Sequence, residues 1–300
     1  MKQGTVAQRW GASDTRPRFH RPWTPWAFLG AAVVVLGVFA ILPTLQVVFY
    51  SFTRYTAFAG PDWVGLQNFR RLLANDRFWF CLQNSFVYLL VTPVLMAVSL
   101  TAALVVHHLA RGGKWLRVLL FLPVVTPAIV ASMSFRLLFN EQSGLINTVL
   151  TSLGLPAVKW LSSYPWTLIS AMTVTLWKGF GYYMMVFLAG LLAVPRELEE
   201  AATIDGAGRL RGFWHVTLPS LRPVLALVAT ISSISAMKVF DELYVTIQGA
   251  PISHQTVVPL IYRTLSEEGE YGLAAAQGVL LFLIILALTV VQLRVQRMGS

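Results

Sequence analysis

The sequence predicts an all-α, polytopic membrane protein with six transmembrane helices and one structured cytoplasmic loop. Of its 300 residues, 56% are hydrophobic and only 12% are charged, and the mean hydropathy is +0.65. Soluble chains carry about 25% charged residues, and a soluble fold of this size cannot bury so much apolar surface. The composition therefore excludes a disordered chain and an ordinary soluble enzyme. The single cysteine, Cys81, excludes an internal disulfide and a cysteine-based metal site.

Six apolar stretches predict the membrane spans, because a helix needs about 20 residues to cross the hydrocarbon core. Pro123 and Pro127 predict a kink in the third span, and Lys178 interrupts the fourth. The polar run Thr230–Ser235 predicts that the fifth helix lies inside the bundle rather than against lipid. The spans are expected at about 26–50, 85–106, 118–136, 165–192, 219–238 and 271–293, within a transmembrane domain over 26–293.

Lys and Arg indicate which side is cytoplasmic. They are about twice as frequent on the side that holds the N-terminal tail 1–25, the loop 195–218 and the C-terminal tail 294–300. Both termini and this loop are therefore expected to be cytoplasmic. The same asymmetry accounts for the formal net charge of +10 without a nucleic-acid partner. The first span is too long for a signal-peptide core and is expected to be retained.

The loop 195–218 has more local structure than a connection between two spans requires. Pro195 and the acidic residues after it favour the start of a helix. Gly206 follows Asp205 and predicts a helix end with a tight turn, since glycine readily adopts the left-handed conformation. A second short amphipathic helix is expected through Phe213 and Val216. The loop is thus predicted to form two short helices joined by an elbow on the cytoplasmic face.

Here a resemblance to a known family becomes specific. Glu200-Ala201-Ala202, Gly206 and Val216-Thr217-Leu218-Pro219, at this spacing, resemble the signature loop of permease subunits of ATP-binding-cassette (ABC) importers. The chain is most similar to the carbohydrate branch that includes maltose and glycerol-phosphate importers, and to the first of the two permease subunits. Further matching segments are Gly65–Phe69, Leu122-Pro123, Ala189–Leu191 and Phe240–Pro251.

The resemblance implies that the loop is a coupling helix that docks on an ATPase subunit. Small alanines permit close helix approach, and Glu200 is suited to pair with a basic residue of the partner. The alternative is an amphipathic helix that lies on lipid headgroups, but its acidic start disfavours anionic lipid. The expected coupling residues are Glu200, Ala201, Ala202, Asp205, Gly206 and Pro219.

The sequence contains no expected catalytic, nucleotide or metal site. Gly112-Gly113-Lys114-Trp115 lacks both the upstream glycine and the hydroxyl residue of a P-loop. No cofactor is therefore expected on this chain, and ATP with Mg²⁺ is expected to be used by partner ATPase subunits. The five histidines are expected at helix ends and in loops: His20, His107, His108, His215 and His254.

The resemblance also implies a substrate path along the fourth and fifth spans. The match to the maltose relative is imperfect, because its amide side chains are absent and Lys178 replaces an apolar residue. Three interpretations of Lys178 remain open: it contacts the substrate, it pairs with Asp241 or Glu242, or it extends toward the external face. The serines are equally consistent with helix packing. The residues carried over are Thr175, Lys178, Gly179, Tyr182, Ser232, Ser235, Ala236 and Val239.

The sequence therefore predicts a multi-pass permease subunit of the cell inner membrane, belonging to an importer for a carbohydrate or polyol. The implied partners are the lipid bilayer, a second permease, two ATPase subunits and an extracytoplasmic solute-binding protein. The resemblance to the first of the two permease subunits favours a different chain over another copy of this one as the second permease. An ion-coupled secondary transporter is the alternative, although neither coupling-ion residues nor an internal repeat is apparent. A membrane-embedded enzyme is disfavoured because the acid pairs, such as Glu199-Glu200, lie in loops.

Overall fold

The computed structural model describes residues 24–109 and 113–298, and the chain divides into two units, Met1–Gln46 and Val47–Ser300. The predicted tail 1–25 lies almost wholly outside the described residues, as does the end of the tail 294–300. The first unit contains helix α1 (Thr24–Leu36), a π-helical turn (Gly37–Ile41) and the start of α2 (Leu42–Ser51). Side chains such as Phe39 are exposed, as expected for a helix that faces lipid.

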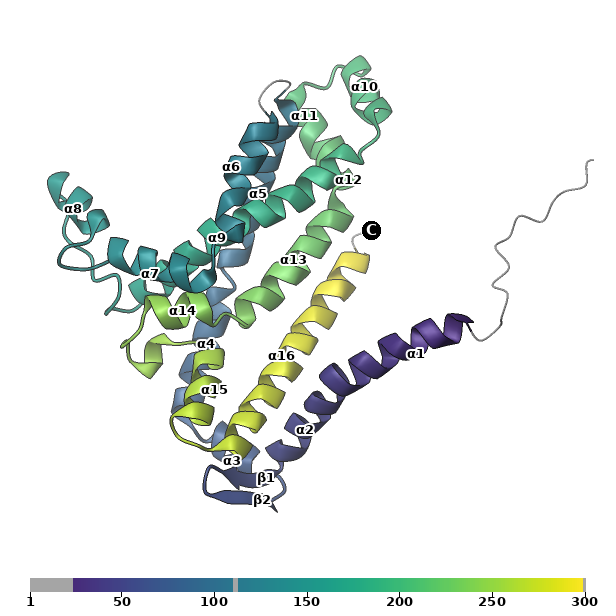
Figure 1. The fold of residues 1–300 in the computed structure, drawn as a ribbon. Helices are drawn as coiled ribbons and strands as arrows, with labels where there is room; N and C mark the ends of the chain where they lie inside the picture. Colours follow the sequence, from purple (N-terminus) through teal and green to yellow (C-terminus); the bar gives the residue numbers. More distant parts are fainter. Residues whose placement is uncertain (1–23, 110–112, 299–300) are drawn as a thin grey trace, which may run out of the picture. The chain divides into compact units, whose positions relative to one another are not determined.

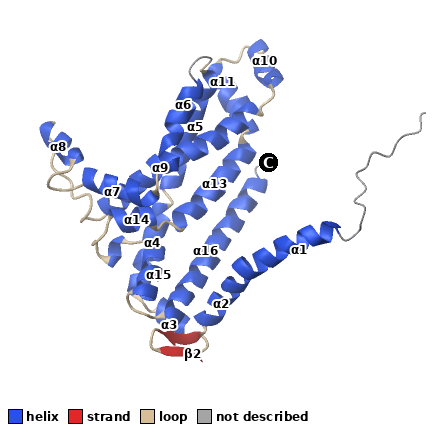
Figure 2. Cartoon of the chain, viewed as in Figure 1, coloured by secondary structure: helices blue, strands red, loops and turns tan. Residues whose placement is uncertain are grey.

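The second unit is almost entirely helical, as Figure 2 shows. Its longest helices are α5, α9 and α16, and short helices lie between the long ones (Figure 1). In chain order the α-helices are α3 (Gln67–Leu73), α4 (Asp76–Tyr88), α5 (Val91–His108), α6 (Gly113–Val125), α7 (Ala128–Leu138), α8 (Leu145–Ser152), α9 (Trp166–Leu192), α10 (Arg196–Ile204), α11 (Arg209–Gly212), α12 (Leu218–Ser220), α13 (Arg222–Met237), α14 (Asp241–Thr246), α15 (Val257–Ser266) and α16 (Tyr271–Met298).

The all-α fold with several apolar helices agrees with the sequence. In the described residues, four helices are long and apolar enough to cross a membrane, and the number reaches six if each of two bent pairs is one span. The bent pairs are α6 with α7, at 92°, and the helical segment Arg209–Ser220 with α13, at 67°. The segment expected as the second span, 85–106, lies within a longer candidate helical stretch, Asp76–His108. The Asn75 side chain caps this earlier start by accepting a hydrogen bond from the Arg77 N–H at 3.0 Å.

The expected kink in the third span is a sharp break. Pro123 lies inside α6, whereas Pro127 directly precedes α7 in an extended conformation. Proline disfavours helical geometry at the residue before it and has no N–H to donate. The break therefore falls at Thr126-Pro127, the second of the two prolines.

A two-stranded antiparallel hairpin was not expected from the sequence. Strand β1 (Thr53–Thr56) pairs with β2 (Ala59–Trp63) at the end of the unit opposite α10 (Figures 1 and 2). The buried Asn68 amide joins the hairpin to α3, because its Nδ2 donates hydrogen bonds to the carbonyls of Ser51 (3.0 Å) and Thr53 (2.8 Å). This geometry gives a structural reason for the motif Gly65–Phe69.

The bundle centre forms around α9 and α13. Helix α9 packs against α5 and α6, and α13 packs against α5, α9 and α16. Ser232 and Ser233 are buried, which confirms that the fifth helix lies inside the bundle. The Gln292 amide of α16 donates to the Ser233 hydroxyl at 2.9 Å. At Gly181 the α6 backbone comes so close that an added Cβ would strike the Leu120 carbonyl oxygen.

Candidate functional site

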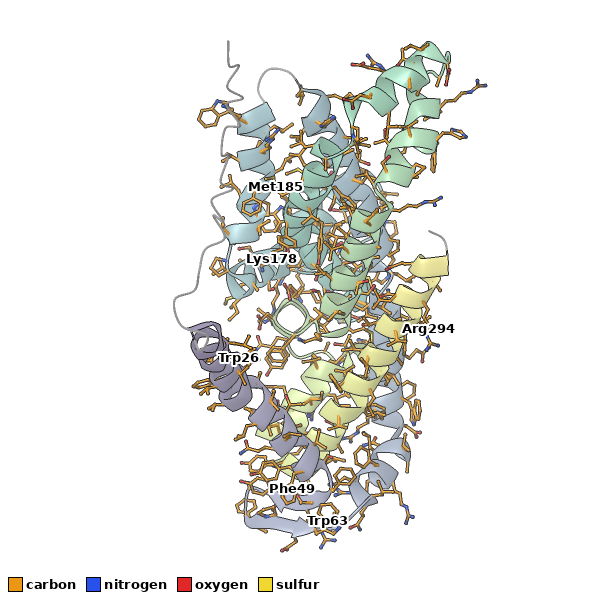
Figure 3. The ribbon with its side chains drawn as sticks, turned by 90° about the vertical axis from the view of Figure 1, so that its right-hand side faces the viewer. Trp26, Phe49, Trp63, Lys178, Met185 and Arg294 are labelled. Atoms are coloured by element: carbon orange, nitrogen blue, oxygen red, sulfur yellow. The ribbon has the colours of Figure 1, made fainter. Side chains whose placement is uncertain are left out.

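A cavity of about 620 Å³ lies between α9, α13 and the start of α14. All eight residues expected along the substrate path line it. Seven of them come from helices α9 and α13, whose residues are some 60 positions apart in the sequence, and Val239 lies just after α13. Their gathering at one cavity requires the packing of α13 against α9. Figure 3 shows Lys178 at mid-height of the second unit, far from the hairpin residue Trp63.

The lining residues divide into those that shape the wall and those that face the open space. Ala236 and Val239 are buried, and the Ser232 hydroxyl donates to the Val228 carbonyl of its own helix at 2.7 Å. The packing interpretation of the serines therefore holds for Ser232. Ser235 is exposed and lines the cavity, and its hydroxyl shares a hydrogen bond with the Tyr183 side chain.

The wall on the α9 side offers both hydroxyl and aromatic groups. Thr175 shares a hydrogen bond of 2.7 Å with the hydroxyl of the buried Tyr88. Tyr182 is 44% exposed and presents an aromatic ring together with a hydroxyl. The open face of the cavity therefore combines Tyr182, Ser235 and the half-buried Lys178. Such a set of hydrogen-bond donors beside an aromatic ring is suited to a polyhydroxylated ligand.

Four further residues line the cavity. Lys238 and Phe240 were not expected there from the sequence, and Asp241 and Glu242 were expected only as partners of Lys178. The signal was present in the sequence, since a charged run directly follows an apolar span. Within the described residues, Lys178 makes no ion pair with either acid, so the proposed pairing is not formed in this structure.

The loop 195–218 forms the predicted pair of short helices. Helix α10 ends in a Schellman motif: the Ala207 N–H donates to the Ala202 carbonyl at 2.9 Å, and the Gly206 N–H donates to the Thr203 carbonyl at 3.1 Å. Gly206 has φ +75°, the left-handed conformation expected from the Asp205-Gly206 pair. The second helical segment starts at Arg209 and runs through a π-helical turn, Phe213–Thr217, to α12.

The surface of this loop is open. Glu200, Ala201 and Asp205 are exposed, and Ile204 is exposed by 86%. Pro219 is half-buried in α12, where it begins the turn toward α13. An exposed helix with small and apolar residues beside carboxylates is suited to docking on another protein. In Figure 1 α10 projects from the end of the unit farthest from the hairpin.

A second cavity, of about 760 Å³, lies behind this loop, between the end of α5 and the segment 202–217. His107 and His108 line it at the predicted helix end. His215 lies in the π-helical turn and His254 in a short 3₁₀ turn, while His20 lies outside the described residues. Burial lowers the pKa of the His254 imidazole below its usual value.

The chain is similar to transport permeases over most of its length. It is 33% identical to the trehalose/maltose transport system permease protein MalF of Thermococcus litoralis, over 88% of this chain and 90% of that protein. It is 36% identical to the arabinooligosaccharides transport system permease protein AraP of Halalkalibacterium halodurans, over 90% of this chain and 86% of that protein. It is 31% identical to the sn-glycerol-3-phosphate transport system permease protein UgpA of Pectobacterium atrosepticum, over 94% of this chain and 97% of that protein.

The fold has a counterpart among solved structures. A chain of a bacterial ABC transporter involved in the import of the acidic polysaccharide alginate superposes with a TM-score of 0.82, at 20% identity, over 93% of this chain and 96% of that chain. The cavity helices and the loop both fall within residues 94–298, which match the model of one protein family. The chain therefore belongs to the family of binding-protein-dependent transport system inner membrane components.

Proposed function

We propose that this chain is the permease subunit of an ATP-driven ABC importer for a carbohydrate or polyol. The observation that supports this most strongly is the cavity at mid-height of the bundle, where Tyr182, Ser235 and Lys178 face the open space. The named relatives handle maltose, arabinooligosaccharides and glycerol phosphate, all of which present several hydroxyls. Ring stacking on Tyr182 and hydroxyl contacts with Ser235 suit such ligands.

The loop 195–218 is proposed to dock on the ATPase subunit, on the cytoplasmic side of the inner membrane. Glu200, Ala201 and Ala202 supply the contact surface, Asp205 and Gly206 fix the elbow, and Pro219 starts the turn toward α13. The Schellman end of α10 supports this role, because a helix held by its own hydrogen bonds can transmit a push as a rigid unit. Movement of the loop would tilt α13, one wall of the cavity, and so alternate access to the substrate.

The chain is proposed to line the substrate pathway and to catalyse no reaction. It binds no cofactor, and ATP with Mg²⁺ is used by two partner ATPase subunits. A second permease, a different chain, completes the pore, and an extracytoplasmic solute-binding protein delivers the substrate. Both termini lie in the cytoplasm. The family description supports the dependence on a binding protein.

Co-purification tests the ATPase contact. The detergent-solubilised complex is isolated from a host that supplies the natural partners, with wild type, Glu200→Arg and Gly206→Trp compared. Asp62→Arg is the matched control, because it reverses an exposed carboxylate on the hairpin at the opposite end of the unit. The ATPase is expected with wild type and Asp62→Arg, and to be lost from folded loop variants. Absence of an ATPase from the wild-type complex would refute the proposal.

A further inference from the structure

The four charged residues of the cavity do not have equivalent surroundings. Asp241 and Glu242 occupy the first turn of α14, where the positive end of the helix dipole favours carboxylates. Lys238 follows the last turn of α13 as its C-cap, where the negative end favours a cation. These three charges are therefore partly compensated by the backbone itself.

Lys178 has no such compensation. It lies near the midpoint of the 27-residue helix α9, away from both helix ends. Among the residues described, none forms a hydrogen bond or ion pair with its ammonium group. A cation within the membrane-spanning part of a protein is costly unless something neutralises it. The open cavity is the space into which a neutralising group can enter.

We propose that Lys178 selects a carbohydrate with an anionic substituent, a carboxylate, sulfonate or phosphate. This inference rests on the proposed function and adds the substrate class to it. The acids that also line the cavity complete the arrangement: Asp241 and Glu242 accept hydrogen bonds from sugar hydroxyls, while Lys178 binds the anionic group. The substrate thereby supplies the counter-charge that the fold lacks.

A cysteine reporter tests the charge without knowledge of the natural substrate. Ser235→Cys places a thiol on the open side of the cavity with little change in volume, and the native Cys81 is buried. The complex in lipid nanodiscs is labelled with an anionic sulfonatoethyl and a cationic trimethylammonioethyl methanethiosulfonate. In a water-like dielectric, a unit positive charge within about 10 Å of the thiol raises the local concentration of the anionic reagent about twofold and lowers that of the cationic reagent about twofold.

The ratio of anionic to cationic labelling rates is therefore expected to fall about fourfold when Lys178→Gln is added to the reporter. Lys178→Arg is expected to keep the ratio. Lys159→Gln is the matched control, since Lys159 is exposed and lies outside the cavity, and it is expected to leave the ratio unchanged. An equal ratio in the Lys178→Gln and Lys178 proteins would overturn the proposal.

Protection by saccharides then tests the substrate class. Digalacturonate and maltose are both α-1,4-linked disaccharides of similar size. They differ in the two carboxylates and in the configuration at C4, so the comparison with Lys178→Gln isolates the contribution of charge. Digalacturonate is expected to slow labelling of the reporter more than maltose does, and Lys178→Gln is expected to abolish this difference. Equal labelling in the presence of the two sugars would overturn the proposal. Because neither readout uses ATP, absence of an ATPase from the wild-type complex would refute the proposed function and leave this test intact.

Discussion

Gly206 offers the sharpest test of the elbow in the loop 195–218. Its φ is +75°, and no atom lies within 4 Å of the position a Cβ would occupy. A substitution there is therefore strained only through the backbone. An L-residue in the left-handed conformation costs about 1–2 kcal/mol, which corresponds to about a 5- to 30-fold change in the population of the closed turn.

Two further substitutions isolate the free-energy cost of placing an L-residue in the left-handed conformation. Gly212 also has open space around its Cβ position, but its φ is −57°, within a helical segment. Gly212→Ala is expected to be neutral or to stabilise the segment by up to about 1 kcal/mol, because alanine favours helix. Gly206→Asn is expected to cost less than Gly206→Ala, since asparagine tolerates the left-handed region better.

Hydrogen exchange measures the effect directly. The amides of Gly206 and Ala207 donate the two hydrogen bonds of the Schellman motif, so their exchange reports opening of the turn. In the assembled complex in nanodiscs, Gly206→Ala is expected to speed exchange in peptides covering 202–208 by about 5- to 30-fold. Exchange as slow as in wild type, or an equal acceleration in Gly212→Ala, would refute the backbone argument.

The remaining predictions concern packing and hydrogen bonds. Gly181→Ala is expected to abolish the monodisperse peak in fluorescence-detected size exclusion, because the new Cβ would strike the Leu120 carbonyl. Gly179→Ala is the control: its Cβ meets only ordinary contacts, so the peak is expected to remain. Equal loss of the peak in both variants would contradict this prediction. Asn68→Leu is expected to cost about 1–3 kcal/mol in stability, because it removes the hydrogen bonds to the carbonyls of Ser51, at the end of α2, and of Thr53, in β1; an unchanged thermal midpoint would count against it. Ser99→Ala, which removes a hydrogen bond to a carbonyl of α9, is expected to cost about 1 kcal/mol in the same assay, and no loss would argue against a net contribution.

The sequence contained most of the local information about the loop. Gly206 and the acids before it indicated a helix end at the right residue, because capping chemistry depends on neighbours in the chain. The second span was different. The helix that contains its start begins at Asp76, which only the Asn75 cap marks, and the charges of Asp76 and Arg77 concealed this helix start from a search for apolar stretches.

The long-range features required the structure. Two prolines predicted a kink, but the 92° break depends on how α7 packs against α14. The hairpin at Thr53–Trp63 depends on Asn68, a single buried amide whose partners lie 15 and 17 residues away. The cavity residues on α9 and α13 were expected through resemblance, whereas the uncompensated state of Lys178 emerged only when the helix ends around it were known.

Transport by the reconstituted complex tests the central claim most directly. Proteoliposomes that contain this chain with its partner permease and ATPase are loaded with ATP and supplied with substrate-charged binding protein, while membrane gradients are dissipated. Uptake that requires internal ATP, and that falls when Gly206→Trp uncouples the loop, is the predicted result. Uptake that continues without ATP when a proton or sodium gradient is imposed instead would contradict the account.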